Sequence, residues 1–105
     1  MINKLSITAI ICTYNEEMHL ERCLKSIKDV VQNINIIDSY STDRTKEIAL
    51  KYNTNYYLKE WTTFSEKFNW ALSNTEITTT WVLRLDADEY LTDILKVNLF
   101  NELPF

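Results

Sequence analysis

Apolar and polar residues alternate between strand-like and helix-like spacing along this 105-residue chain. Short β-branched apolar runs are typical of buried strands, whereas apolar residues three and four positions apart are typical of amphipathic helices. The first pattern predicts strands over residues 5–12, 34–38, 55–58 and 80–86. The second pattern predicts four intervening and following helices, whose apolar faces run over residues 20–31, 48–52, 64–72 and 94–103.

Polar residues mark where three of these helices are expected to begin. Ser41 is the expected N-cap of the second helix, with Asp43 in its first turn. Thr63, followed three residues later by Glu66, forms a capping box ahead of the third helix. Thr92 is expected to cap the last helix. Pro104 would close that helix.

Four successive strand–helix units predict an α/β fold, namely a Rossmann-like parallel sheet with helices on both faces. The whole chain, residues 1–105, is expected to form a single domain, because its length suffices for one modest core. In an open sheet of this kind, ligands bind outside the carboxyl ends of the strands. That edge is therefore where functional side chains are expected.

Acidic side chains end two of the predicted strands. Asp86 and Asp88 close the fourth strand, and residues two apart in an extended segment share a face, so both could reach one divalent cation. Asp38 closes the second strand. Because both strand ends lie at the same edge of the sheet, the sequence predicts a site for a metal and an anionic ligand such as a nucleoside diphosphate.

Composition narrows the chemistry further. The sequence contains no glycine, so neither common Gly-rich phosphate loop can form, and a phosphate must be held by a metal, by side chains or by ordinary backbone amides. A net charge of −4 argues against a nucleic-acid partner. No apolar run approaches the ~20 residues of a membrane span, and no secretory leader pattern opens the chain. Cys12 and Cys23 are expected to be free thiols in a reducing cytoplasm.

Five segments, in this order and spacing, resemble the N-terminal half of inverting GT-A glycosyltransferases of family 2. Within that family, the chain resembles bacterial enzymes that add sugars to lipopolysaccharide core or other surface glycans. These segments are residues 10–17 (IICTYNEE), 36–39 (IIDS), 41–45 (STDRT), 64–72 (FSEKFNWAL) and 85–89 (LDADE). The resemblance implies transfer of a sugar from a nucleotide-diphosphate donor, with a UDP-sugar expected, to a glycan or lipid-linked acceptor. It also implies a cytoplasmic protein, with a peripheral position at the inner face of the membrane as one option.

The resemblance also implies roles for individual residues. Thr13 and Glu16 would approach the uracil and ribose, and Asp38 would accept a hydrogen bond from one of them. Asp86 would contact the ribose, and Lys67 would contact a phosphate or the base. Asp88 would ligate a divalent cation on the diphosphate, Mg²⁺ or Mn²⁺ rather than Zn²⁺ because the ligands are oxygens. That cation would act as a Lewis acid on the leaving diphosphate.

The sequence departs from the family pattern in three ways. Tyr40 stands where the family often has glycine, and Phe68 where it often has arginine. The chain also stops about where the family's second half, with its acceptor site and catalytic base, would begin. No catalytic base is therefore assigned, little sugar transfer is expected from this chain alone, and apolar residues around Leu95, Leu99 and Leu103 are expected to favour a homo-oligomer.

Two other classes of protein stay open at this point. A receiver-type signalling domain is also doubly wound and binds Mg²⁺, but it needs an acid pair after its first strand and an aspartate after its third. Here Asn15 and Glu16 follow the first strand, and Leu58 ends the third. The other class is a non-catalytic remnant that folds or self-associates without turnover.

Overall fold

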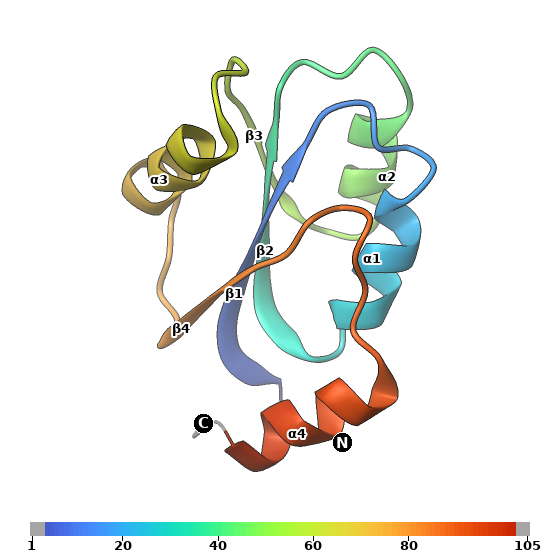
Figure 1. Ribbon diagram of the computed structural model, residues 1–105, viewed down its shortest axis with the longest axis vertical. Coiled ribbons are helices and arrows are strands. Elements are labelled where there is room, and N and C mark those ends of the chain that lie inside the picture. Colours follow the sequence, from blue (N-terminus) through green and yellow to red (C-terminus); the bar gives the residue numbers. More distant parts are fainter. Residues whose placement is uncertain (1–3, 103–105) are drawn as a thin grey trace.

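The computed structural model describes residues 4–102 as one parallel sheet with helices on both of its faces (Figure 1). The predicted fold class is confirmed. The strands are β1 (Leu5–Thr13), β2 (Val31–Asp38), β3 (Asn55–Leu58) and β4 (Trp81–Arg84). The helices are α1 (Leu20–Ile27), α2 (Thr45–Lys51), α3 (Phe64–Asn74) and α4 (Asp93–Glu102).

The strand order is β3-β2-β1-β4, and every neighbouring pair is parallel. This is the order of the first four strands of a classic Rossmann sheet, in which β1 lies between β2 and β4. A receiver-type domain instead places its third strand beside its first. The strand order therefore excludes the receiver alternative, and it puts the topological switch point between β1 and β4.

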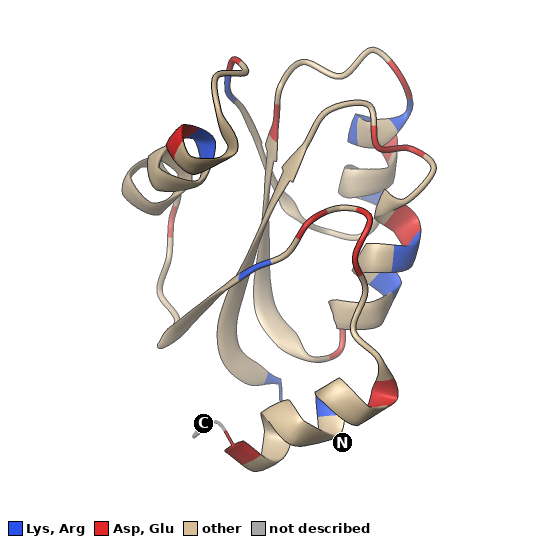
Figure 2. Cartoon of the chain, viewed as in Figure 1, with Lys and Arg blue, Asp and Glu red and all other residues tan. Residues whose placement is uncertain are grey.

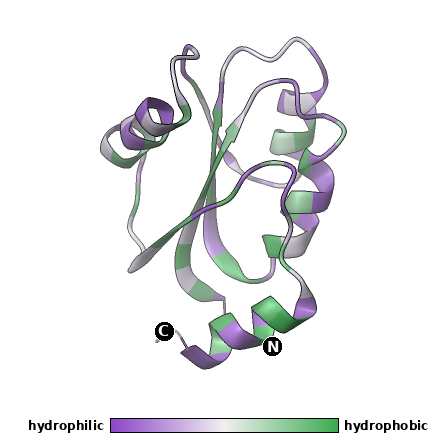
Figure 3. Cartoon of the chain, in the orientation of Figure 1, coloured by the Kyte–Doolittle hydropathy of each residue, from purple (hydrophilic) through white to green (hydrophobic). Residues whose placement is uncertain are grey.

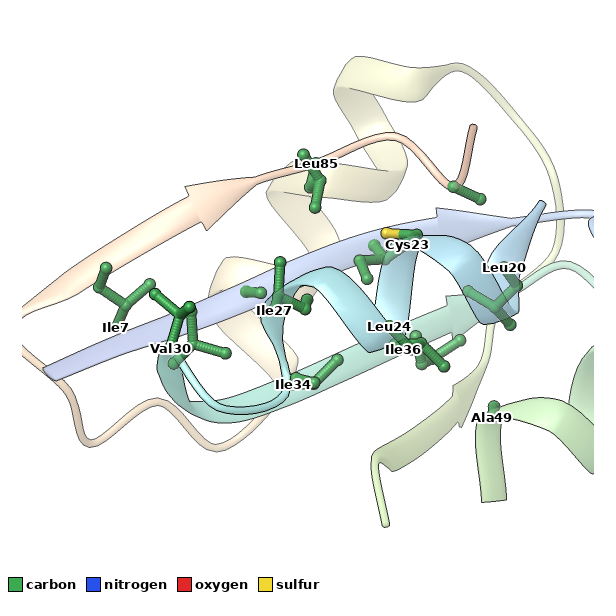
Figure 4. Close-up of a cluster of buried hydrophobic side chains, with 14 of the residues drawn as sticks. Ile7, Leu20, Cys23, Leu24, Ile27, Val30, Ile34, Ile36, Ala49 and Leu85 are labelled. Atoms are coloured by element: carbon green, nitrogen blue, oxygen red, sulfur yellow. The ribbon is translucent and has the colours of Figure 1, made fainter. Parts of the chain in front are cut away.

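Helices α1 and α2 cover one face of the sheet and α3 covers the other (Figure 1). The apolar positions of α1, spaced as predicted, are all fully buried, and β1, which lies beneath them, is rich in hydrophobic residues (Figure 3). Figure 4 shows these side chains packed onto β1 and β2. The main core on this face contains Leu20, Cys23, Leu24 and Ile27 from α1, with Ile7, Ala9, Ile11 and Ile36 from the strands.

The face beneath α3 has a smaller core and more polar contacts. Ile10, Ile37 and Ala71 form its buried apolar cluster. Beside it, the hydroxyl oxygens of Thr8 and Thr79 lie 2.6 Å apart, which fastens the segment before β4 to β1. Because β1 is covered on both faces, it is buried nearly throughout, as expected of a central parallel strand.

Several predicted boundaries were wrong. α1 ends at Ile27, not Val31, because the β-branched Val31 begins β2, three residues earlier than predicted. β4 ends at Arg84 rather than Asp86. Ser41 does not cap α2; the Asp43 carboxylate, which precedes the helix, instead accepts the Thr45 N–H at 2.9 Å. The caps predicted at Thr63 and Thr92 are confirmed by bonds from the Glu66 and Leu95 N–H groups.

The last helix, α4, lies at the end of the molecule where β1 begins (Figure 1). Its Ile94, Leu95 and Val97 side chains are exposed, whereas Leu99 is half-buried against the main core. Leu103 and Pro104, which were expected to continue and close this helix, lie outside the described residues. Within residues 4–102, no helix has the length and apolarity needed to cross a membrane.

Candidate functional site

The carboxyl ends of three strands are level with one another. Thr13 at the end of β1 pairs in register with Asp38 at the end of β2, and Asp38 pairs with Leu58 at the end of β3. The fourth strand is shorter and stops at Arg84, level with Ile10. The sheet therefore presents Thr13 and Asp38 side by side at the edge where ligands of such folds bind.

Asp38 is fully buried, and its carboxylate accepts four hydrogen bonds. Its Oδ1 accepts from the hydroxyls of Thr13 (2.6 Å) and Ser41 (2.5 Å). Its Oδ2 accepts from the Ser41 N–H (2.8 Å) and the Tyr56 hydroxyl (2.7 Å). Burial by itself would raise the pKa of Asp38, but the hydrogen bonds from Ser41, Thr13 and Tyr56 lower it below its ordinary value.

Lys67 on α3 is also fully buried. Its ammonium donates a 2.9 Å hydrogen bond to the carbonyl of Thr13 and lies 5.4 Å from the ring centroid of Trp61. Burial lowers the pKa of Lys67, although the nearby Cys12 and Asp38 act in the opposite direction. Thr13 is thus held at both ends, by Asp38 through its side chain and by Lys67 through its carbonyl.

A pocket of about 610 Å³ opens above this arrangement. Its wall includes Trp61 and Phe64, whose rings meet edge to face at 4.9 Å between centroids. Cys12, Thr13, Tyr14 and Glu16 supply the rest of the lining. An aromatic and apolar wall beside a few fixed polar groups is the usual make-up of a small-molecule site.

Positive backbone φ angles occur in both loops at this edge. Tyr40 in the β2–α2 loop has φ 57° and Asn15 in the β1–α1 loop has φ 50°. Asparagine tolerates this left-handed conformation, but in an aromatic residue the Cβ is brought too close to the backbone and the conformation is strained. The position at which the family often has glycine therefore does require positive φ, and Tyr40 occupies it under strain.

The segment after β4 leaves the sheet early and passes over α1. The last ladder bond runs from the Leu85 N–H to the Ile10 carbonyl at 3.2 Å. Asp86 and Glu89 then close a turn, because the Glu89 carboxylate accepts the Asp86 N–H and the Asp86 carbonyl accepts the Glu89 N–H. The fourth strand, predicted to reach Asp86, thus ends two residues earlier, and Asp86 and Asp88 are both exposed in the turn that follows.

This turn brings acidic residues from distant parts of the sequence together, as the red segments at this edge show (Figure 2). Burial raises the pKa of Glu16, and the charges of Asp88, Asp43 and Asp86 raise it further, whereas His19 lowers it. The Arg22 guanidinium donates to the Asp88 carbonyl at 3.1 Å and stacks on Tyr90, which ties the turn to α1. Glu16 and the two aspartates thus share one electrostatic neighbourhood.

The donor set fits a hard divalent cation that completes its coordination with ligand phosphates. Among residues 4–102, no three acidic, histidine or cysteine side chains are arranged to enclose a metal. Mg²⁺ is usually bound by only one or two carboxylates, with waters and substrate phosphates filling the remaining positions. The exposed carboxylates of Asp86 and Asp88 are consistent with that mode of binding and not with an all-protein cage.

The structure gathers the predicted residues at one edge, but in two layers. Thr13 and Glu16 line the pocket, while Asp38 and Lys67 lie fully buried beneath it. Sequence reasoning missed Tyr56, whose contact with Asp38 depends on β3 lying beside β2. The structure adds the pairing of Trp61 with Phe64, the first residue of the segment 64–72, as a wall of the pocket.

The comparisons with known proteins agree with this geometry. Glycosyl transferase family 2 matches residues 8–101. An uncharacterized glycosyltransferase of Rickettsia bellii is 33% identical over 90 residues, which cover 86% of this chain and 30% of that relative. The lipopolysaccharide core biosynthesis glycosyltransferase LpsC of Rhizobium meliloti is 31% identical over 101 residues, which cover 91% of this chain and 36% of LpsC. The chain spans about a third of the length of these curated relatives.

Solved structures show the same fold. TarS 1–349 of S. aureus, in complex with UDP, superposes with a TM-score of 0.67 at 28% identity, covering 90% of this chain and 31% of TarS. The mannosyltransferase PcManGT of Pyrobaculum calidifontis, in complex with GDP-Man and Mn²⁺, superposes with a TM-score of 0.70 at 23% identity, covering 97% of this chain and 34% of that enzyme. With its Rossmann-like GT-A sheet, its ordered motifs and a match over residues 8–101, this chain belongs to glycosyl transferase family 2.

Proposed function

We propose that this chain forms the donor-binding part of a glycosyltransferase that takes a UDP-sugar together with Mg²⁺ or Mn²⁺. The observation that carries the proposal is the pocket at the carboxyl end of β1, the strand that borders the topological switch point of the sheet. Such a switch point is where nucleotides bind in open α/β sheets. The UDP held by TarS, a relative of the same fold, supports UDP as the nucleotide.

The base and ribose occupy the pocket, with Thr13 and Glu16 next to them. Asp38 is the further predicted contact, and its position supports an indirect route to the ligand. All four acceptor positions of its carboxylate are filled, so a bond from the base requires the Thr13 or Ser41 hydroxyl to turn away. If neither hydroxyl turns away, Asp38 acts indirectly, by fixing the orientation of the Thr13 hydroxyl.

Lys67 supports the same pocket from below. Its ammonium is bonded to the Thr13 carbonyl and covered by Trp61, so its charge reaches a bound phosphate only across these groups. Asp86, which lies outside the pocket lining, is the proposed ribose contact. Its charge reaches both Cys12 and Glu16 of the pocket, which supports that placement.

Asp88 is the proposed metal ligand, with the donor diphosphate supplying further oxygens. A bound divalent cation would provide Lewis-acid stabilisation of the charge that develops on the leaving diphosphate. The Mn²⁺ in the complexes of PcManGT and of glucosyl-3-phosphoglycerate synthase from Mycobacterium tuberculosis supports this choice of cofactor. Arg22 and Glu89 hold the turn that carries the metal ligand, through the Asp88 carbonyl and the Asp86 N–H.

The acceptor is proposed to be a glycan or a lipid-linked glycan, with lipopolysaccharide core as one candidate, and transfer is proposed to invert the anomeric centre. The name of LpsC, which matches over most of this chain, supports the lipopolysaccharide candidate. A cytoplasmic location, with the protein free or at the inner face of the membrane, belongs to the same proposal, because a UDP-sugar donor is a cytoplasmic metabolite.

Calorimetric titration of the chain with UDP, with Mn²⁺ or EDTA, tests the donor site directly. We expect saturable binding in Mn²⁺ and clearly weaker binding in EDTA. GDP serves as the competing nucleotide, because PcManGT carries GDP-Man on the same fold. Absence of UDP binding in Mn²⁺ would rule out the proposed donor, and tighter binding of GDP than of UDP would replace it.

A further inference from the structure

We propose that Asn15 is a positioning residue that fastens the loop after β1 to the loop after β2 and so holds the pocket wall in place before any ligand arrives. The first loop covers residues 14–19 and the second covers residues 39–44. The link to nucleotide binding rests on the proposed function. The fastening of the two loops does not depend on the proposed function.

The Asn15 side chain reaches from the first loop into the second. Its Oδ1 accepts the N–H of Thr42 at 2.8 Å and is 3.4 Å from the N–H of Asp43. The Thr42 hydroxyl also points to this oxygen, at 3.5 Å. One amide oxygen thus satisfies backbone donors of the second loop that would otherwise need water, as backbone N–H groups generally require a partner.

Hydrogen bonds donated by the backbone of the first loop complete the contact between the two loops, which we call the seam. The N–H groups of residues 15, 16 and 17 donate to side-chain oxygens of the second loop and α2: Ser41 Oγ at 2.8 Å, Thr45 Oγ1 at 2.8 Å and Asp43 Oδ2 at 3.1 Å. Three successive donors can point the same way because Asn15 adopts φ 50°. Asparagine is one of the few non-glycine residues that tolerates this conformation, and the chain has no glycine to place there.

The seam closes a ring of contacts that includes Thr13 and Tyr14 of the pocket lining. Ser41 accepts from the Asn15 N–H and donates to Asp38. Asp38 accepts from the Thr13 hydroxyl, and Thr13 is joined to Asn15 through Tyr14. Tyr14 is 54% exposed and lines the pocket, so its backbone is held on both sides while its ring remains free to meet a ligand. The Asn15 side-chain amide lies outside this ring and braces it, because its Oδ1 holds the Thr42 and Asp43 N–H groups that follow Ser41 in the second loop.

Two variants separate the amide from the backbone conformation. Asn15→Gly keeps access to positive φ but removes the acceptor. Asn15→Asp keeps an acceptor oxygen at the same place and also tolerates positive φ. The readouts are amide hydrogen exchange of Thr42 and Asp43 by NMR in the ligand-free chain, and the UDP affinity in Mn²⁺ by calorimetry. A purely structural role would weaken both variants, whereas a positioning role predicts rescue by aspartate.

We expect Asn15→Gly to speed exchange at Thr42 and Asp43 by about tenfold and to weaken UDP binding by about three- to tenfold, the range that loss of one or two neutral hydrogen bonds supplies. Asn15→Asp should restore both values to within about twofold. Unchanged exchange in Asn15→Gly would overturn the fastening role. Faster exchange with unchanged UDP affinity would overturn the role in the pocket.

The two proposals fail in different ways. If the wild-type chain binds no UDP, the proposed function is wrong, and the exchange data alone decide whether Asn15 fastens the loops. If Asn15→Gly does not fold, Asn15→Asp carries the test, because its carboxylate must protect the Thr42 and Asp43 amides at least as well as the wild-type amide does at pH 7. Loss of that protection would overturn the proposal.

Discussion

The hydroxyl of Tyr56 on β3 donates a 2.7 Å hydrogen bond to the carboxylate of Asp38 at the end of β2. This contact joins a strand with no functional motif to the central acid of the site. Burial and the donation of the Tyr56 proton to this bond both favour the protonated hydroxyl, so the pKa of Tyr56 is raised well above its ordinary value. Asp38 is consequently a buried anchor for three segments of the chain.

Removing this bond should destabilise the fold in a pH-dependent way. Tyr56→Phe should lower the free energy of unfolding at pH 7 by about 1.5–3 kcal/mol, the range for hydrogen bonds to a charged group. The folded-state pKa of Asp38 is lowered, so its stabilising contribution is present above the unfolded pKa of about 4 and is lost as the pH falls through the folded value. The penalty should therefore shrink below about pH 4.

Urea unfolding at pH 7 and pH 3 measures this difference. Tyr57→Phe is the matched control on the same strand, because within residues 4–102 the one hydrogen bond of the Tyr57 hydroxyl is a long one, accepted from the Glu76 N–H at 3.5 Å. An equal penalty for Tyr56→Phe at both pH values would show that the bond does not depend on the Asp38 charge.

Glu16 should destabilise the folded chain as the pH rises above about 4, whereas Asp38 stabilises it there. Burial and the neighbouring Asp88, Asp43 and Asp86 raise its folded-state pKa, so the folded state loses stability as the pH rises through the unfolded pKa of about 4.3 toward the higher folded value. Glu16→Gln should therefore be more stable than wild type at pH 7 and no more stable below about pH 4. Thermal melts across this range, with Glu17→Gln as the control, test the sign. A gain that is the same at both ends would mean that charge is not the cause.

Asp88→Asn should weaken UDP binding much more in Mn²⁺ than in EDTA, because the carboxylate acts through the cation and not on the nucleotide itself. Calorimetry in the two buffers gives the comparison. Asp29→Asn removes an exposed carboxylate from the α1–β2 connection, at the other end of the strands, and should leave both affinities unchanged. Equal affinities of wild type and Asp88→Asn in Mn²⁺ would contradict the assignment of Asp88 to the metal.

Tyr40→Gly should stabilise the chain. Tyr40 has φ 57°, a conformation that costs a non-glycine residue about 1–2 kcal/mol, while glycine costs about 0.5–1 kcal/mol in unfolded-state entropy. The net gain in the free energy of unfolding should be about 0.5–1 kcal/mol. Tyr40→Ala keeps the Cβ and should show no such gain by denaturant unfolding. If alanine stabilises as much as glycine, the benefit comes from losing the exposed ring and not from relieving the backbone.

Self-association through α4 is the remaining prediction. Ile94, Leu95 and Val97 are 75%, 48% and 58% exposed, and contiguous apolar surface of this kind favours contact with a second copy. Light scattering should show a mass above that of the monomer that falls on dilution. The double variant Ile94→Lys with Val97→Lys should shift the chain to monomer, whereas Lys substitutions at the exposed polar Asn98 should not. A monodisperse wild-type monomer at all concentrations would refute it.

The sequence alone determined the order and type of the elements and the place of Asp38 at the end of its strand. Apolar spacing at Leu20, Cys23, Leu24 and Ile27 was enough to place the buried face of α1, because helical periodicity is a local property. Strand ends were read within a few residues for the same reason. The resemblance to the family added the expected roles of Thr13 and Asp88, which periodicity cannot supply.

Only the tertiary structure decided how those residues are connected. Asp38 becomes saturated because Tyr56 arrives on a neighbouring strand and Thr13 ends level with it, and strand order is not written in local periodicity. β4 ends before Asp86 because the Glu89 carboxylate closes a turn there, which replaces the next ladder bond. Lys67 is buried because α3 packs that side chain under Trp61 and against Thr13, 54 residues away in sequence. Contacts of such long sequence separation depend on the packing of the whole chain, which no segment of it encodes alone.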